Sequence, residues 1–191
     1  VGPPYVGLAF SVVEAHRRWI VFEAYLVAYP ICSVALAKQL GKQSLPARRP
    51  DLCVRAGDKW MMDPGRPGTA EHIAAMAKEI VENYEVDGIH LDYIRYPEKE
   101  IPFNDNKTYA HYGHGQPKAQ WRRDNVTRTV RKVAEAVRSV RPWVKMSCSP
   151  IGKYADLPLH MSYGWNARDA VNQDAQAWLR EGWMDMLFPM M

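Results

Sequence analysis

The chain alternates between helical and strand-like segments, and this alternation constrains its fold more than any other feature. Four stretches with apolar residues at helical spacing each lead, through a short connection, into a short apolar stretch typical of a strand. The predicted helices are 8–18, 69–83, 121–140 and 167–181, and the predicted strands are 20–29, 88–94, 144–150 and 184–189. Because parallel strands need crossover helices, we predict an α/β fold.

The predicted connections differ in length according to their direction. Those from helix to strand are short, whereas those from strand to helix are long, at 30–68, 97–120 and 150–166. Long loops at the carboxyl ends of parallel strands carry the sites of α/β enzymes, so we expect the functional residues there. No internal repeat or linker is evident, and we predict one domain over 1–191 without an internal boundary.

Composition excludes several classes of protein. The 25 Lys and Arg residues nearly balance the 21 Asp and Glu, and a net charge of +4, evenly scattered, does not indicate a nucleic-acid partner. No run of roughly 18 apolar residues occurs, so no membrane-spanning helix is predicted. The three cysteines form neither a disulfide framework nor a zinc site; a Cys32–Cys53 bridge is an alternative, but buried free thiols are favoured.

The most informative polar residues lie on the predicted strand 88–94. Strand alternation places His90 and Asp92 on one side and the apolar residues between them on the other. A carboxylate at the end of an interior strand is costly to bury, so Asp92 needs a partner or a function. Either Arg95 neutralises it, or Asp92 acts as an acid, base or nucleophile, with Arg95 and Tyr96 setting its pKa and contacting substrate.

The long loops hold further candidates, each with a structural alternative. Asp63 sits in a Pro-Gly turn but could reach into the site, and Trp60 could stack on a sugar ring. His111 and His114 could ligate a metal, yet no third ligand has a recognisable spacing, so exposed loop histidines are favoured. For the arginine pair at 122–123, anchoring of the preceding loop is favoured over substrate binding. The motifs of common serine hydrolases, nucleotide-binding proteins and metalloproteases are absent.

Several motifs, in the same order along nearly the whole chain, resemble one known family. They are EAHRR at 14–18, DPG at 63–65, NYEVDGIHLDYIRYP at 83–97, WRRDN at 121–125, SPIG at 149–152 and the segment 178–189. On these residues the chain is similar to the glycosyl-hydrolase-like family 10, the YngK-like group, and most of all to its Bacteroidetes members. Trp19 stands where the family usually has Gly, and Glu23 where it often has His.

The resemblance implies a TIM (β/α)₈ barrel that hydrolyses a glycan, with some relatives acting on peptidoglycan glycan strands. It also implies an exported protein, periplasmic or at the cell surface, with a lipid anchor as one option in the full-length protein. Such a barrel takes about 250 residues. We therefore expect an incomplete barrel, with about four βα units from its middle.

We predict a glycoside hydrolase that uses paired carboxylates and no metal or cofactor. Asp92 is the first carboxylate; Asp63, Glu23 or a residue beyond Met191 would supply the second. The predicted substrate-binding residues are His90, Arg95, Tyr96, Trp60, Trp165, Asn166 and Tyr29. Two alternatives remain: a carbohydrate-binding barrel without turnover, and a metal-dependent hydrolase or deacetylase that uses His90 or the loop histidines.

Overall fold

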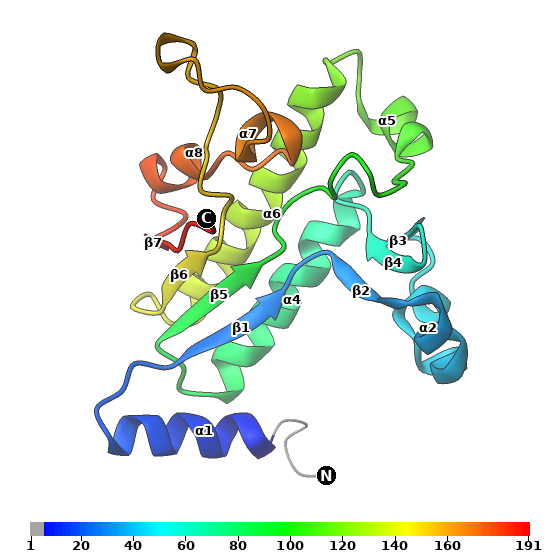
Figure 1. Cartoon of the computed structure of the whole chain (residues 1–191). Coiled ribbons are helices and arrows are strands. Elements are labelled where there is room, and N and C mark those ends of the chain that lie inside the picture. Colours follow the sequence, from blue (N-terminus) through cyan, green and yellow to red (C-terminus); the bar gives the residue numbers. More distant parts are fainter. Residues whose placement is uncertain (1–5) are drawn as a thin grey trace.

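The centre of the fold is a four-stranded parallel sheet in the order β1-β5-β6-β7 (Figure 1). The strands are β1 (Glu23–Val27), β5 (Gly88–Asp92), β6 (Lys145–Cys148) and β7 (Met186–Leu187). This computed structural model describes residues 6–191. Over these residues the sheet stays open, with β1 and β7 at its edges, so the strands form an arc of a (β/α) barrel. The predicted fold class and its incomplete closure are confirmed.

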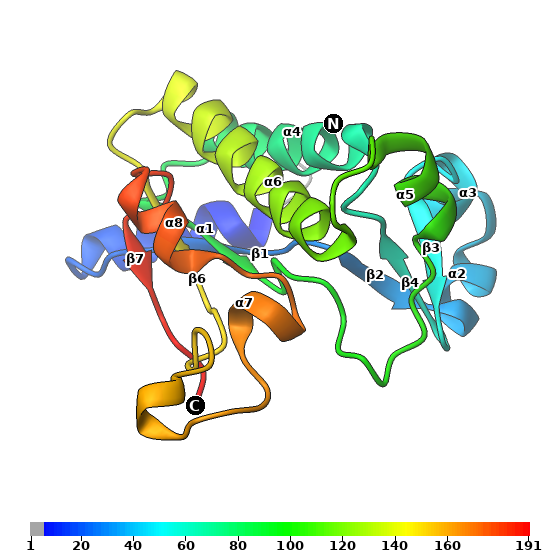
Figure 2. The ribbon, with the colours of Figure 1, turned by 90° about the horizontal axis from the view of Figure 1, so that it is seen from above.

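Two long helices cover one face of this sheet. Helices α4 (Pro67–Asn83) and α6 (Lys118–Val140) lie side by side there (Figure 2). Their buried stripes carry the helical spacing that the sequence shows: Ile73, Ala77 and Val81 on one, and Val126, Val130, Val133 and Val137 on the other. The alternate strand residues Ala24, Leu26, Ile89, Leu91, Met146 and Cys148 join them in one core cluster. The opposite face of the sheet therefore carries the polar residues of β1, β5 and β6.

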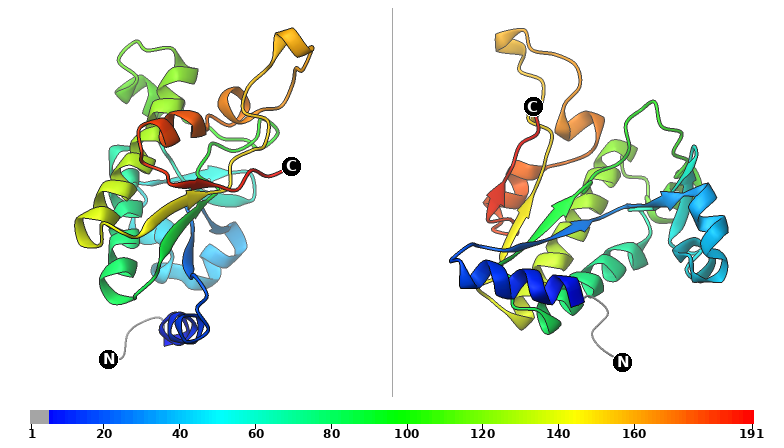
Figure 3. Two further views of the ribbon diagram at one scale, coloured as in Figure 1. Left: turned by 90° about the vertical axis from the view of Figure 1, so that its left-hand side faces the viewer. Right: turned by 60° about the horizontal axis from the view of Figure 1, so that its bottom comes forward.

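Helix α1 (Val6–Arg17) lies across the ends from which the strands start (Figures 1 and 3). Asp87 fixes this end: its Oδ2 accepts hydrogen bonds from the Phe22 backbone N–H at 2.7 Å and from His16 Nε2 at 2.9 Å. These bonds hold the pKa of Asp87 below its usual range although burial acts to raise it. Asp87 therefore fixes the turn before β5, at the end of the sheet opposite Asp92.

The segment between β1 and α4, predicted as a loop, contains a second sheet. Its antiparallel strands β2 (Pro30–Ser33), β3 (Cys53–Ala56) and β4 (Lys59–Met62) have the order β2-β4-β3. Helices α2 (Val34–Leu40) and α3 (Leu45–Arg48), with a 3₁₀ turn at Gly41–Gln43, lie between β2 and β3. Each strand has only four residues, too few for a clear alternation of apolar and polar side chains. The loop prediction was wrong for this reason.

Other helix and strand boundaries also differ from the predicted ones. The first strand begins at Glu23, not at residue 20. Helix α4 begins at Pro67, not at residue 69, and the Thr69 hydroxyl donates to the Asp63 backbone carbonyl at 2.7 Å. The remaining helices are α5 (Asn106–Tyr112), a 3₁₀ turn at Pro158–His160, α7 (Ala167–Ala170) and α8 (Ala175–Arg180).

The last predicted helix, 167–181, is thus two short helices. They are separated at Asn172, whose backbone has the left-handed φ of 62°, and at Gln173, whose buried side chain donates to the Ile94 carbonyl at 3.4 Å. A buried amide with a partner outside the helix favours the break. The three cysteines are free thiols, as predicted. Within residues 6–191 no helix is long and apolar enough to cross a bilayer.

Gly65 provides a direct test of packing under the Asp-Pro-Gly turn. A Cβ at this position would lie 2.4 Å from the Trp121 ring, a rigid and buried group. We expect Gly65→Ala to destabilise the protein by about 1–3 kcal/mol, measured by urea unfolding. Gly7→Ala is the matched control, because nothing lies within 4 Å of its Cβ position and alanine favours the helix. An unchanged urea midpoint for Gly65→Ala would show that the turn tolerates a side chain.

Candidate active site

The polar face of the main sheet forms the candidate site. The strand registers place Tyr25, His90 and Ser147 at one level across β1, β5 and β6, and Val27 beside Asp92 at the carboxyl end. These side chains point away from α4 and α6, because their neighbours in each strand are buried in the helix-facing core. Asp92 therefore lies at the edge where (β/α) enzymes hold their sites.

Asp92 has a different partner from the one predicted. Its side chain belongs to the buried polar residues, at 8% exposure, and the Tyr25 hydroxyl donates a short hydrogen bond to its Oδ2. This hydrogen bond, together with burial and the Asp92 charge, raises the pKa of Tyr25 to about 12. Arg95 instead lies 3.6 Å from the Glu98 carboxylate. The alternative in which Arg95 neutralises Asp92 is therefore wrong, because the chain turns after Tyr93 and carries Arg95 away from the strand.

A chain of hydrogen bonds links Glu23, Ser147, His90 and Ser149 on the same face. The Ser147 hydroxyl donates to Glu23 Oε2 at 2.5 Å and contacts His90 Nδ1 at 2.9 Å, while His90 Nε2 lies 2.9 Å from the Ser149 hydroxyl. Since the Ser147 proton is committed to Glu23, the Ser147 oxygen accepts, and Nδ1 of His90 must donate. A neutral His90 therefore keeps Nε2 free of a proton and accepts from Ser149 there.

Gly88 allows Glu23 to join this chain. The Glu23 side chain crosses over Gly88 from β1 toward β6, and a Cβ on Gly88 would lie 2.8 Å from Glu23 Cγ. The Tyr25 and His90 rings stack with centroids 5.4 Å apart, and Phe188 packs on His90 at 5.7 Å. His90 is thus held by rings as well as by hydrogen bonds, and the site has a fixed imidazole beside its carboxylate.

We expect Glu23→Gln to change which ring nitrogen of His90 carries the proton. The glutamine amide can donate to the Ser147 oxygen, so the Ser147 proton becomes free to point at Nδ1 and the Nε2–H tautomer gains population. We expect this tautomer to rise severalfold, read from ¹⁵N chemical shifts of the imidazole. Glu85→Gln, an exposed glutamate before β5, is the matched control. An identical tautomer ratio in Glu23→Gln would show that Ser147 does not relay the Glu23 charge.

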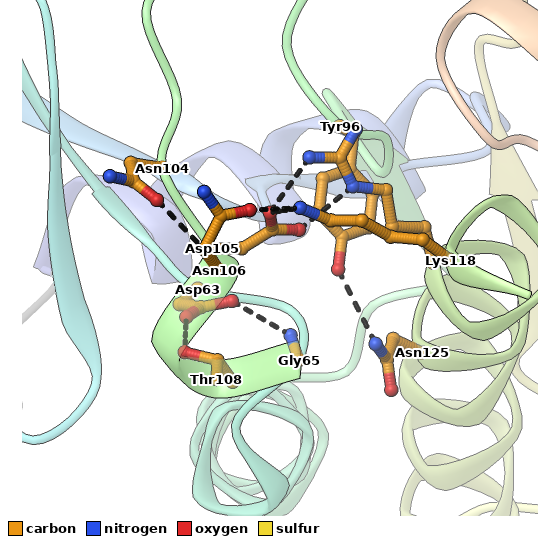
Figure 4. Close-up of polar contacts among 10 residues, drawn as sticks. Asp63, Gly65, Tyr96, Asn104, Asp105, Asn106, Thr108, Lys118 and Asn125 are labelled. Atoms are coloured by element: carbon orange, nitrogen blue, oxygen red, sulfur yellow. Dashed lines mark hydrogen bonds and ion pairs between the residues drawn. The ribbon is translucent and has the colours of Figure 1, made fainter. Parts of the chain in front are cut away.

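Asp63 lies in a different cluster, next to Gly65 and to Thr108 of α5 (Figure 4). The side chain is buried at 1% exposure; it accepts from the Gly65 backbone at 3.0 Å and from the Thr108 hydroxyl at 2.5 Å. Burial raises its pKa. The catalytic role predicted for Asp63 does not fit this position, because its buried oxygens are used to hold a turn and a helix together.

Asp105 neighbours Asp63 and anchors the long loop after β5. Its fully buried carboxylate lies 2.6 Å from Lys118 Nζ and accepts two hydrogen bonds of 2.8 Å from Arg122. The Arg122 guanidinium also lies over the Tyr96 ring, 4.9 Å from its centroid. Figure 4 shows these contacts meeting at the start of α6. The loop-anchoring prediction for the arginine pair is confirmed for Arg122.

Three predicted substrate-binding residues are buried structural groups. Tyr29 and Tyr96 have 0% and 1% exposure, and burial raises the pKa of Tyr96 well above its usual value. Asn166 caps α7 by accepting from the Asp169 backbone at 2.8 Å. Tyr29 and Asn166 therefore leave almost no surface for a sugar, and the predictions for them are corrected, whereas Tyr96 forms part of the wall of the pocket after β5. The position of a residue along the sequence does not report its burial.

The remaining predicted residues lie on the surface. Trp60 is half-buried on β4, and Trp165 is 51% exposed on the loop after β6. His111 packs edge-on against Tyr112 at the end of α5. Within residues 6–191 no group of three or more His, Cys, Asp or Glu side chains could hold a metal ion. The site thus brings together His90 and Asp92 of the predicted set.

Sequence reasoning missed Tyr25, Ser147, Ser149 and Phe188. The signal for them was the same alternation that identified His90, applied to the strands on each side of β5. It could not be used without the strand order, which fixes which residues share a level.

Comparison with known proteins agrees with this geometry. Residues 3–191 match a family model described as "Glycosyl hydrolase-like 10". The chain is 30% identical over 197 residues to the protein named Glycosyl hydrolase YngK of Bacillus subtilis (strain 168), covering 98% of this chain and 39% of that protein. It is 31% identical over 202 residues to Glycosyl hydrolase DigH of Escherichia coli (strain K12), covering 98% and 46%.

The chain therefore spans less than half the length of these relatives. Among solved structures, alpha-L-fucosidase isoenzyme 2 from Paenibacillus thiaminolyticus is similar with a TM-score of 0.54 and 17% identity, over 76% of this chain and 23% of that one. At this identity the likeness concerns the fold alone, which is that of a glycosidase barrel. The match over nearly the whole chain shows that the protein belongs to the glycosyl hydrolase-like 10 family.

Proposed function

We propose that this protein hydrolyses O-glycosidic bonds in a poly- or oligosaccharide, with Asp92 as an acting carboxylate. The observation that carries the proposal is the position of Asp92, at the carboxyl end of a central strand with Tyr25 donating to it. In such a reaction the bond between the anomeric carbon and the leaving oxygen breaks. Water supplies the new oxygen on the sugar and the proton on the leaving group.

A second carboxylate is required by this chemistry. Glu23 lies beside Gly88 in the strand register, and its carboxylate is committed to the Ser147 hydroxyl. Asp63 is committed to the turn that it holds. We therefore propose that the partner of Asp92 is contributed from outside the described residues. A polymeric glycan outside the cell would suit the export expected from the family resemblance.

The test is a screen of the full-length protein against denuded peptidoglycan glycan strands and against plant and host glycans. Products are identified by mass, because each hydrolysed bond adds the mass of one water. We expect one glycan class to yield shortened chains with intact reducing ends. Binding to a glycan without shortened products would favour the carbohydrate-binding alternative instead.

A further inference from the structure

A pocket opens directly after Asp92, between the small sheet and the segment 93–101. Its volume is about 290 Å³, close to the lower end for small-molecule sites. Apolar groups, among them Pro30, Met61 and Ile101, form most of its wall. This pocket lies on the loop side of the barrel arc, continuous in sequence with the candidate carboxylate.

The turn after β5 shapes this pocket. Tyr93 has a left-handed φ of 49°, a conformation that is rare for a bulky aromatic residue, and its ring is 47% exposed. The Arg95 backbone N–H donates to the Tyr93 carbonyl at 2.8 Å, which closes a tight turn. The Arg95 guanidinium therefore lies 5.1 Å from the centre of the Tyr93 ring, inside the pocket. Backbone strain of this kind concentrates at functional sites.

Arg95 has an unused hydrogen-bonding nitrogen there. Its side chain is 11% exposed, and Nη2 lies 3.6 Å from the half-exposed Glu98 carboxylate. Nη1 is buried and has no hydrogen-bond partner among the described residues. A buried donor without a partner is costly, so the Arg95 guanidinium keeps hydrogen-bonding capacity that a ligand oxygen entering the pocket could use. Lys59 lines the same pocket, so two cations face one carboxylate, that of Glu98.

We infer that this pocket is a subsite for a carboxylate-bearing sugar, with Arg95 binding the carboxylate and Tyr93 and the apolar wall packing against the ring. The planar guanidinium matches a carboxylate through paired hydrogen bonds. The inference rests on the proposed function and narrows its substrate to an acidic glycan. Two sources share this chemistry: a uronic acid, which carries the carboxylate at C6, and an amino sugar with an ether-linked lactyl group.

The test measures binding by calorimetry to the full-length protein carrying Asp92→Asn, which slows turnover. Two matched pairs separate the sources. Chitotetraose is compared with the alternating tetrasaccharide of N-acetylglucosamine and N-acetylmuramic acid, and cellotetraose with its C6-oxidised form. We expect the acidic member of one pair to bind about tenfold more tightly than the neutral one.

Arg95→Gln should remove this preference, and Lys59→Gln, at the exposed rim, should reduce it by a smaller factor. The preference should also fall as salt is raised. If neither pair shows a preference, or if a folded Arg95→Gln protein keeps it, the subsite is refuted. If Arg95→Gln does not fold, Lys59→Gln and the salt series are the test. A preference that neither Lys59→Gln nor raised salt reduces would then refute the subsite.

Cleavage by the unmutated protein is measured separately on all four glycans. An acid preference in binding without any cleavage would refute the proposed function and leave the subsite. Cleavage without a preference for either acidic member would refute the subsite and leave the function.

Discussion

Asp92→Asn is expected to lower glycan cleavage by the full-length protein about 10²–10⁴-fold, the range over which a positioned acid or base contributes. The amide keeps the shape of the carboxylate and can still accept from Tyr25, so the site is retained while the charge and the basic oxygen are lost. The measurement is the rate of product formation on the glycan that the screen identifies, with the melting temperature recorded alongside.

Asp124→Asn is the matched control. Asp124 is exposed on α6 and accepts from the amides of Gln116 and Gln120, so its change should leave cleavage within about twofold. Tyr25→Phe adds an intermediate case, since it removes only the hydrogen bond to Asp92. Full cleavage by a folded Asp92→Asn protein would mean that another group performs the chemistry.

The largest structural effect is expected from Asp105→Asn. The substitution removes the charge that Lys118 and Arg122 share, and leaves two cations beside a buried amide. Breaking a buried ion pair from one side costs about 3–5 kcal/mol. We expect a loss of unfolding free energy of this size, measured in urea at neutral pH, together with faster proteolysis of the loop between β5 and α6.

Acid titration gives an independent check on Asp105. Burial acts to raise the pKa of Asp105, but the hydrogen bonds from Arg122 and Lys118 outweigh it and lower the pKa. A carboxylate with a lowered folded pKa contributes stability above its unfolded pKa, about 3.9, and loses it as the pH falls through the folded pKa. Asp105→Asn should therefore flatten the acid limb of the stability curve.

Asp63 changes the pH dependence of stability in the opposite direction to Asp105, because burial raises the pKa of Asp63. The stability that Asp63 contributes is lost as the pH rises from its unfolded to its folded pKa. Asp63→Asn should therefore remove an unfavourable contribution to stability at neutral pH while it weakens the bond to Thr108.

Asp124→Asn is the exposed reference for Asp105→Asn as well. A neutral-pH stability of Asp105→Asn equal to that of Asp124→Asn would show that the buried ion pair contributes nothing.

The long elements could be predicted because their signal is local. Helix α6 carries its apolar stripe over 23 residues, and β5 alternates apolar and polar side chains over five. The small sheet could not be predicted, since each four-residue strand of it is defined by its pairing with the others rather than by its own pattern. The break between α7 and α8 could not be predicted either, because it depends on the burial of Gln173 and its contact with Ile94, just after β5.

The sequence by itself determined the α/β class, the family and the placement of His90 and Asp92 on one side of a strand, since all three follow from periodicity and from motifs within single segments. Only the tertiary structure decided which side chains contact one another in the site. Tyr25 meets Asp92, and Glu23 reaches Ser147 across Gly88, because β1, β5 and β6 pair in one register. Asp63 and Arg95 were assigned correctly only once burial and the turn at Tyr93 were known. Pairing and burial join residues far apart along the chain, and no local pattern records them.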